Sequence, residues 1–155
     1  MPLPVPAAYE EWMRRALADA ARAAATGDVP VAALVVDAGE RVIGTGRNER
    51  ELLRDPTAHA EVLALREAAS SRADWNLEGC TLVVTLEPCA MCAGAILGAR
   101  VTTVVFGAWD EKAGAAGSLY DILRDRRLPA RSEVYAGVLA EECRALLLAF
   151  FEAKR

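Results

Sequence analysis

The chain has 155 residues, a length typical of one domain of ~100–200 residues and sufficient to bury a hydrophobic core. Apolar residues make up 54% and charged residues 26%, and no run approaches the ~20 apolar residues of a membrane span, so composition excludes a disordered chain and a membrane-spanning one. The net charge of −4 argues against broad, sequence-independent binding of nucleic acid, because that affinity comes from Lys and Arg that neutralise phosphates.

The opening residues and the cysteines indicate a compartment. Residues 1–6 contain neither a basic region nor an uninterrupted apolar run, so we expect no secretory signal and a cytoplasmic protein. The four cysteines are Cys80, Cys89, Cys92 and Cys143. In a reducing compartment they are expected to be thiols or metal ligands rather than two disulfides.

The first part of the chain predicts a helix followed by a hairpin. Residues 7–26 place apolar side chains at helical spacing with charged ones between, which predicts an amphipathic helix that ends at Gly27. The apolar run 31–36 predicts a strand. A turn at 37–40 leads into a second predicted strand, 41–46, so we expect an antiparallel pair.

The rest of the chain predicts helices that alternate with strands. A polar connection, 48–55, precedes Pro56-Thr57, and this helix-start chemistry predicts a helix that begins near His59. The further predicted elements are a helix body at 60–69, strands at 80–86 and 101–106, a short helix at 90–97, a weak strand at 133–135 and a last amphipathic helix at 139–153.

This order predicts an α/β fold, a three-layer α/β/α sandwich around a mixed five-stranded sheet, in a single domain over 1–155. The longest irregular loop, 107–118, is a candidate for substrate contacts.

One constellation of residues predicts metal chemistry. The only histidine stands in His59-Ala-Glu61 at a predicted helix start, and the turn Pro88-Cys89-Ala-Met-Cys92 supplies two thiols that can bind one metal ion. His-x-Glu followed by Pro-Cys-x-x-Cys is the signature of zinc deaminases that act on nucleobases. The ligands His59, Cys89 and Cys92 leave the fourth tetrahedral position for water, which is typical of a catalytic zinc site.

The predicted helix starts also suit this chemistry. Both direct positive dipole ends at the metal, which favours thiolates at Cys89 and Cys92. Because His59 and Glu61 are two residues apart, they reach one site only if it lies beyond the helix end. Glu61 is therefore the predicted catalytic residue, which takes the water proton and returns it to the heterocycle nitrogen and then to the leaving amine.

The residues of this motif also have interpretations without a metal. Glu61 could be a first-turn partner of the helix dipole, Cys89 and Cys92 a reduced buried pair, and His59 a core histidine. A thioredoxin-like redox pair is also open, although it does not explain the histidine motif. Cys80 and Cys143 are expected in the core.

Several segments together carry a family resemblance. They are Gly27–Val31, Asp55–Glu61, Thr85–Cys92, Ala113–Ser118 and Phe150-Phe151. Over nearly the whole chain the sequence resembles the bacterial tRNA-specific adenosine deaminases of the TadA type, within the cytidine deaminase-like superfamily. The zinc motif alone indicates only the superfamily, whereas Ala113–Ser118 and the two Phe residues favour the tRNA branch.

The resemblance implies a cytidine deaminase-like fold, one zinc ion per subunit, and deamination of adenosine to inosine at the wobble position of a tRNA anticodon loop, in particular that of an arginine tRNA, by a homodimer. It implies that Asn48 contacts the target nucleoside, that Asp110 lies near its ribose, and that Val29, Leu86 and Glu87 belong to the pocket and its rim.

Candidate RNA contacts outside the pocket are less specific. Lys112 and the four arginines of 124–131 could meet phosphates, and Phe151 could stack on a base, although a solvated loop and core packing of at least one terminal Phe are the plainer interpretations. Trp109, where many relatives carry a basic residue, and the less basic tail 152–155 weaken the phosphate contacts.

Two other functions stay open. A free guanine or cytosine deaminase would use the same zinc and glutamate, but would need a tail that closes over the pocket. A catalytically silent RNA- or protein-binding relative would need no general base, and the intact Glu61 argues against it. Dimerisation is further suggested by the apolar residues Ile96 and Leu97 near the zinc helix.

Overall fold

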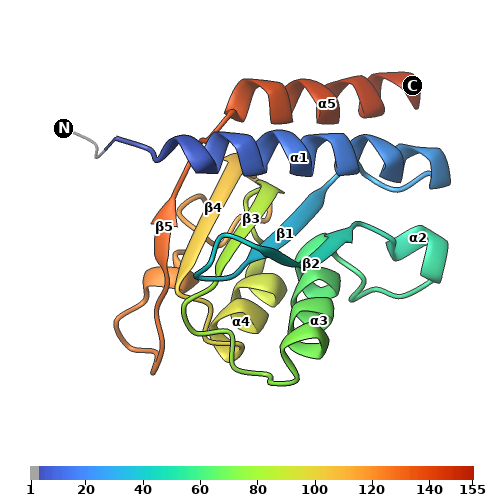
Figure 1. Cartoon of the computed structure of the whole chain (residues 1–155). Helices are drawn as coiled ribbons and strands as arrows, with labels where there is room; N and C mark the ends of the chain where they lie inside the picture. The colour runs from blue at the N-terminus through green and yellow to red at the C-terminus, as the bar shows by residue number, and fades with distance from the viewer. Residues whose placement is uncertain (1–3) are drawn as a thin grey trace.

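The computed structural model describes residues 4–155 and contains a mixed five-stranded sheet with helices on both faces (Figure 1). Its strands are β1 (Ala32–Val36), β2 (Val42–Arg47), β3 (Thr81–Leu86), β4 (Thr103–Ala108) and β5 (Glu133–Tyr135). Its helices are α1 (Ala7–Ala23), α2 (Arg50–Leu53), α3 (Ala60–Arg72), α4 (Ala90–Gly98) and α5 (Ala140–Ala153), with short 3-10 helices at Ala24–Thr26 and Ile122–Arg124. The predicted α/β/α sandwich is confirmed.

The start of the chain is only partly described. The expectation of no secretory signal concerns residues 1–6. Of these, Met1–Leu3 lie outside the described residues. From residue 4 onward no helix combines the length and the hydropathy that crossing a bilayer requires.

The sheet has the strand order β2-β1-β3-β4-β5. β1 pairs antiparallel with β2 and with β3, whereas β3, β4 and β5 run parallel. The predicted hairpin is confirmed, and its register shifts between Val35 and Val36. Because β3 and β4 are parallel, the residues that follow them emerge at the same edge of the sheet, where binding sites of α/β folds usually form.

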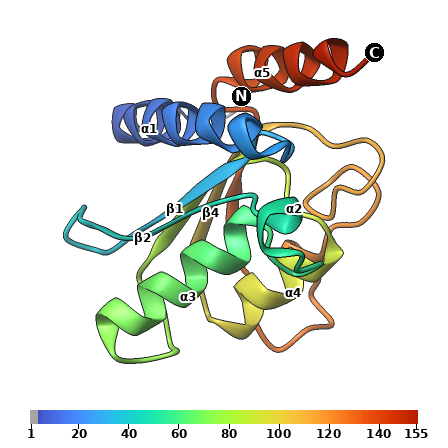
Figure 2. The ribbon, with the colours of Figure 1, turned by 90° about the vertical axis from the view of Figure 1, so that its right-hand side faces the viewer.

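Helices cover the two faces of the sheet in pairs. α1 and α5 lie side by side on one face, and α3 and α4 cover the other (Figures 1 and 2). Phe106 and Ile96 are fully buried on the α3 and α4 side, and Met13 and Leu34 are fully buried under α1. The two layers of apolar side chains fix the sheet between the helix pairs.

Two glycines of β2 allow α3 to lie unusually close to the sheet. A Cβ atom added at Gly44 would overlap the backbone of Ala64, and one at Gly46 would overlap the backbone of Ala60. The side-chain period of two places both glycines on the face that α3 covers. Glycine is thus required here by close approach, and this contact sets the position of the first turn of α3.

Three sequence expectations need correction. The predicted polar connection contains α2, because the buried Asp28 carboxylate accepts hydrogen bonds from the backbone N–H groups of Glu51 (2.6 Å) and Leu52 (3.3 Å). Such a cap, more than 20 residues upstream, is invisible to local patterns. β4 begins at Thr103 rather than at Val101.

The third correction concerns the last helix and the dimer argument. Neither terminal Phe belongs to a core cluster, since Phe150 is half-buried and Phe151 is 50% exposed. Ile96 and Leu97 are buried core residues, so they give no support to a dimer. Cys80 and Cys143 are buried as expected.

The close contact between β2 and α3 gives a stability prediction. Gly44→Ala should destabilise the protein by about 1–3 kcal/mol, because the added methyl group forces α3 away from the sheet. Urea unfolding followed by circular dichroism measures this change. Gly39→Ala, in the exposed turn between β1 and β2, is the control and should lie within about 0.5 kcal/mol of the parent. Equal stability of the two variants would contradict the close packing.

Candidate metal centre and pocket

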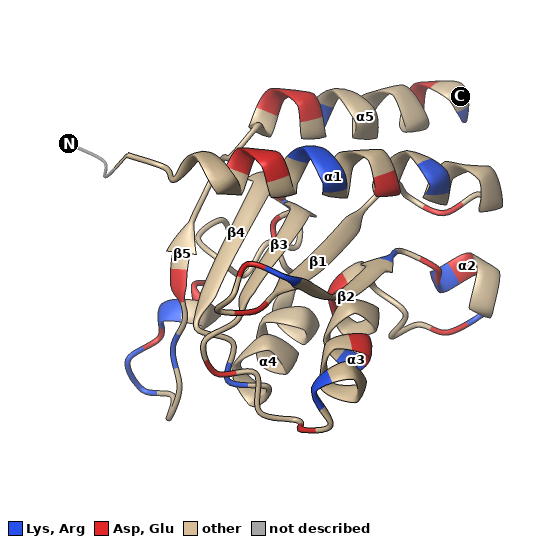
Figure 3. Ribbon diagram, viewed as in Figure 1, with Lys and Arg blue, Asp and Glu red and all other residues tan. Residues whose placement is uncertain are grey.

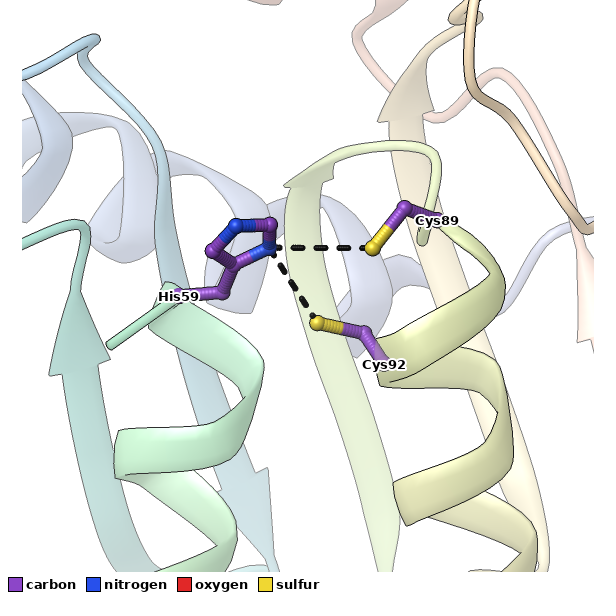
Figure 4. A group of neighbouring side chains, drawn as sticks. All are labelled: His59, Cys89 and Cys92. Atoms are coloured by element: carbon purple, nitrogen blue, oxygen red, sulfur yellow. Dashed lines mark hydrogen bonds between the residues drawn. The ribbon is translucent and has the colours of Figure 1, made fainter. Parts of the chain in front are cut away.

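Three side chains from two helix starts converge beside the ends of β3 and β4. His59 is the N-cap of α3 and Cys89 is the N-cap of α4, while Cys92 lies in the first turn of α4. His59 Nδ1 lies 3.7 Å from Cys89 Sγ and 3.5 Å from Cys92 Sγ (Figure 4). Neither N-cap side chain makes a capping hydrogen bond, so both are free to face one point.

The spacing of these atoms fits one zinc ion. Tetrahedral zinc with Zn–N of ~2.0–2.1 Å and Zn–S of ~2.3 Å places its nitrogen and sulfur ligands about 3.6 Å apart. The observed separations of 3.7 and 3.5 Å match that value, and all three ligand atoms lie within 4.8 Å of one another. His59, Cys89 and Cys92 are therefore arranged to bind a single zinc ion with one tetrahedral position left over.

The contacts among His59, Cys89 and Cys92 favour the thiolate form of Cys89. Hydrogen bonds from the Cys92 thiol and from His59 lower the pKa of Cys89 to about 4, against the opposing effect of burial. The pKa of Cys92 is raised, because its thiol donates to Cys89 and because it is buried. The hydrogen bond to Cys89 raises the pKa of His59. A zinc dication bound by both sulfurs would favour thiolates at the two cysteines. The adjacent helix N-termini act in the same direction.

Glu61 lies in the first turn of α3 and lines the same pocket as His59. Only 4% of its surface is exposed. Burial raises the pKa of its carboxyl group, and a hydrogen bond with Cys92 partly opposes this effect. A carboxyl group in this environment holds a proton more readily than an exposed one, as a group that transfers protons requires.

His59 and Cys89 of the metal centre line a cavity of about 170 Å³. This is smaller than the ~300–1,000 Å³ of pockets for drug-sized ligands and suits one heterocyclic ring system. Its lining residues are Val29, Val31, Asn48, Arg50, His59, Ala60, Glu61, Leu86, Glu87, Cys89, Asp110 and Ala113. The cavity thus combines apolar walls with a few converging polar groups.

Most of the predicted pocket residues are brought together. Val29, Asn48, Leu86, Glu87 and Asp110 all line the cavity, whereas Lys112 and Phe151 do not. Sequence reasoning missed Val31, Arg50, Ala60 and Ala113. No local signal pointed to Arg50, which reaches the pocket through the folded position of α2, where its backbone N–H donates to the Asn48 side chain at 3.1 Å, as in an Asx turn.

Two polar groups of the lining are held in place by the backbone. Asn48 Nδ2 donates to the carbonyl oxygen of Val29 at 3.2 Å. Asp110 Oδ1 accepts hydrogen bonds from the backbone N–H groups of Lys112 and Ala113. Each side chain still has hydrogen-bonding capacity to offer a ligand.

The Glu87 carboxylate accepts several hydrogen bonds from one loop of the protein. Burial alone would raise its pKa, but hydrogen bonds from Ser118, Asp110 and Ala116 hold the pKa below its usual value. All of these donors belong to the loop that follows β4. Glu87 therefore forms part of the pocket wall through its contact with this loop.

The end of the basic segment 124–131 lies away from the pocket, whereas Arg124 at its start donates to the carbonyl oxygen of Ala116 at 3.3 Å. Ala130 and Arg131 share a surface hollow with Glu78 and Thr102, which precede β3 and β4, whereas the pocket adjoins the other ends of these strands. Six-residue strands separate the two ends by about 20 Å. In Figure 3 the arginines of this segment lie in the loops next to β5. The arrangement favours a solvated loop.

The C-terminal end of α5 approaches the pocket rim without lining the cavity. Lys154 Nζ donates to the carbonyl oxygen of Gly27 at 3.3 Å and lies 4.8 Å from the centre of the Phe150 ring. Gly27 is two residues before Val29 of the lining. Trp109 packs edge-to-face on Phe106, with ring centres 4.9 Å apart, and is 49% exposed.

Comparison with known proteins places this site in a family. A family model for the cytidine and deoxycytidylate deaminase zinc-binding region matches residues 6–108. A tRNA-specific adenosine deaminase of Haemophilus influenzae is 48% identical over 94% of this chain and 84% of its own length. That of Bacillus subtilis is 46% identical over 94% of this chain and 90% of its own length.

Solved structures agree with the sequence comparison. A structure from a study of A-to-I editing by tRNA:A34 deaminases at the wobble position has a TM-score of 0.84 and 36% identity, covering 88% of this chain and 98% of that one. A guanine deaminase from Nitrosomonas europaea is more distant, with a TM-score of 0.79 and 27% identity over 97% of this chain and 86% of that one. The chain belongs to the cytidine and deoxycytidylate deaminase zinc-binding family and, within it, to the tRNA-specific adenosine deaminases.

Proposed function

We propose that the chain, acting as one zinc-dependent deaminase domain over its whole length, converts adenosine to inosine at the wobble position of a tRNA anticodon loop. The observation that carries this proposal is the open side of the pocket. No described residue after Ala113 lines the cavity, so the C-terminal helix does not close over a small substrate. An open pocket is what a nucleotide within a polymer requires, because its flanking nucleotides must stay outside.

The size of the cavity agrees with a single base from an unpaired loop. Anticodon-loop bases are unstacked and can be turned into a pocket without opening a duplex. The apolar side chains of Val29 and Leu86 can sandwich a heterocycle, and Asn48 and Asp110 supply hydrogen-bonding groups at its edge.

The reaction consumes water and releases ammonia. His59, Cys89 and Cys92 would hold the zinc ion, which would supply an activated water for attack on the ring carbon that bears the amino group. Glu61 accepts one proton of the attacking water and donates it to the ring nitrogen, and then transfers the second proton from the new hydroxyl group to the leaving amine. Its burial next to Cys92 keeps this proton within the pocket.

RNA contacts outside the pocket are expected from residues at its rim. Arg50 lines the pocket and Lys112 adjoins Ala113 of the lining, so both are candidates for phosphate contacts. Phe151, exposed on α5, is a candidate for base stacking. Since tRNA is the proposed substrate, we place the protein in the cytoplasm.

The test of this function is a panel of substrates. The zinc-loaded protein is incubated with an arginine-tRNA anticodon stem-loop that carries a wobble adenosine, with free adenosine, and with guanine and cytosine, and inosine and ammonia are measured. We expect inosine from the stem-loop and no product from the free compounds. The same stem-loop with guanosine at the wobble position is the control. Ammonia from guanine without inosine from RNA would instead establish a free-base deaminase, as in the Nitrosomonas relative.

A second prediction separates the chemistry from metal binding. Glu61→Gln should keep one zinc ion per chain and lose turnover about 10²–10⁴-fold, because the amide cannot accept the water proton. Cys89→Ala should lose zinc and turnover together, because it removes a ligand. Metal analysis and single-turnover kinetics on the same preparations give both quantities. Normal turnover of Glu61→Gln, or full zinc in Cys89→Ala, would refute the assigned roles.

We also propose that the active form is a homodimer. The outer side of α4 supports it, because Met91 is 39% exposed and a side chain at Gly94 or Gly98 would meet open space. An apolar helix face with small residues allows a second copy to pack closely against it.

A charge on this face tests the dimer. Gly94→Arg leaves the fold of the single chain intact, since nothing lies within 4 Å of the added side-chain position. We expect the mass from light scattering to fall from twice 16.6 kDa to 16.6 kDa in this variant. A parent protein that is already monomeric at micromolar concentration, or a dimeric variant, would contradict the proposed interface.

A further inference from the structure

A buried carboxylate outside the catalytic group holds one wall of the pocket. Glu87 follows β3, is 2% exposed and precedes the metal ligand Cys89 by two residues. Its Oε1 accepts a hydrogen bond from the backbone N–H of Asp110 at 3.0 Å and one from the Ser118 hydroxyl. Its Oε2 accepts the backbone N–H groups of Ala116 and Ser118, each at 3.0 Å.

All four donors come from the loop that follows β4, which is therefore folded around one carboxylate. Burying a charged carboxylate is unfavourable unless hydrogen bonds replace its hydration, and these four bonds do so. They span nine residues, from Asp110 to Ser118, so a single side chain fixes both ends of the loop. A loop with little regular structure of its own gains a defined shape in this way.

A glycine confirms how closely the loop wraps the carboxylate. A Cβ atom added at Gly114 would overlap the Glu87 carboxylate itself. Next to Gly114, the backbone N–H of Ala115 donates to the carbonyl oxygen of Pro88 at 2.7 Å, and Gly114 forms an isolated β-bridge with Cys89. The loop is thus attached to the chain segment that carries a zinc ligand.

Two residues of this loop, Asp110 and Ala113, form part of the pocket wall. We propose that Glu87 is a positioning residue: it sets Asp110 and Ala113 at a fixed distance from the zinc ligands and thereby orients the target nucleoside toward Glu61. The Glu87 side chain makes no contact with the reacting atoms in this role. The inference rests on the proposed function only for the identity of the substrate.

The main test is Glu87→Gln. The amide keeps the size of the side chain but presents N–H groups to backbone N–H donors, so at least one pair of bonds is lost. We expect full zinc content and a fall in kcat/KM for the stem-loop of about 10–100-fold, carried more by kcat than by KM, because the bound base is misplaced. Hydrogen exchange should become faster at the amides of residues 110–118 and stay unchanged in α3.

Variants of the partners make the test specific. Ser118→Ala should lower kcat part of the way and Ser118→Thr, which keeps the hydroxyl group, should restore it. Gly114→Ala should reproduce the kinetic effect of Glu87→Gln, because the new methyl group displaces the carboxylate. Glu111→Gln, an exposed carboxylate of the same loop, is the matched control and should keep the kcat of the parent protein.

The outcomes separate the positioning role from others. If Glu87→Gln accelerates exchange in the loop but leaves kcat/KM unchanged at full zinc content, the loop has only a structural role and the proposal is wrong. A loss of activity in proportion to zinc would also overturn it, since Glu87 would then act through Cys89. If the parent protein deaminates a free base instead of the stem-loop, the proposed function fails, and the same variants measured on that base still test the positioning role.

Discussion

The site depends on one constraint: two helices begin at the same point beside the end of a parallel strand pair. His59 and Cys89 occupy N-cap positions, where a side chain normally bonds to its own helix, yet both face the metal centre instead. The unpaired N–H groups of the helix starts then provide positive potential around the thiolates. Moving either helix start by one residue would turn its ligand away, so the packing of α3 and α4 against the sheet is part of the metal chemistry.

The two walls of the pocket are held by buried carboxylates that do not belong to the metal centre, Asp28 and Glu87. Asp28 binds the start of α2 and thus the segment with Asn48 and Arg50. Glu87 binds the loop with Asp110. Each carboxylate is buried and accepts hydrogen bonds from backbone N–H groups of a distant part of the chain. Irregular segments with few apolar residues can therefore keep a defined shape at the rim of the pocket.

The difference between local spacing and long-range contacts explains which features the sequence could predict. His59, Glu61 and the two cysteines lie in short segments where spacing along a helix determines direction, so their convergence followed from local geometry. The strands followed from apolar runs bounded by turns. By contrast, α2 depends on a cap from Asp28, and the course of the loop after β4 depends on Glu87, contacts that join residues 23 to 31 positions apart. No local pattern of polarity or propensity reports such pairs. Arg50 was missed for the same reason, because only the folded position of α2 brings it into the pocket.

The chemistry and the choice of substrate are thus specified by different kinds of contact. The zinc ligands, Glu61 and the helix starts form one unit, and it lies within a fold that this chain shares with a guanine deaminase. The segments around the opening leave the C-terminal helix outside the cavity, with Lys154 bound to Gly27 at the rim. The side chains of such segments can change without disturbing the metal ligands, because their anchors, Asp28 and Glu87, bind mainly backbone N–H groups of these segments. A rigid catalytic unit surrounded by separately anchored walls allows one fold to act on a free base or on a nucleotide within RNA.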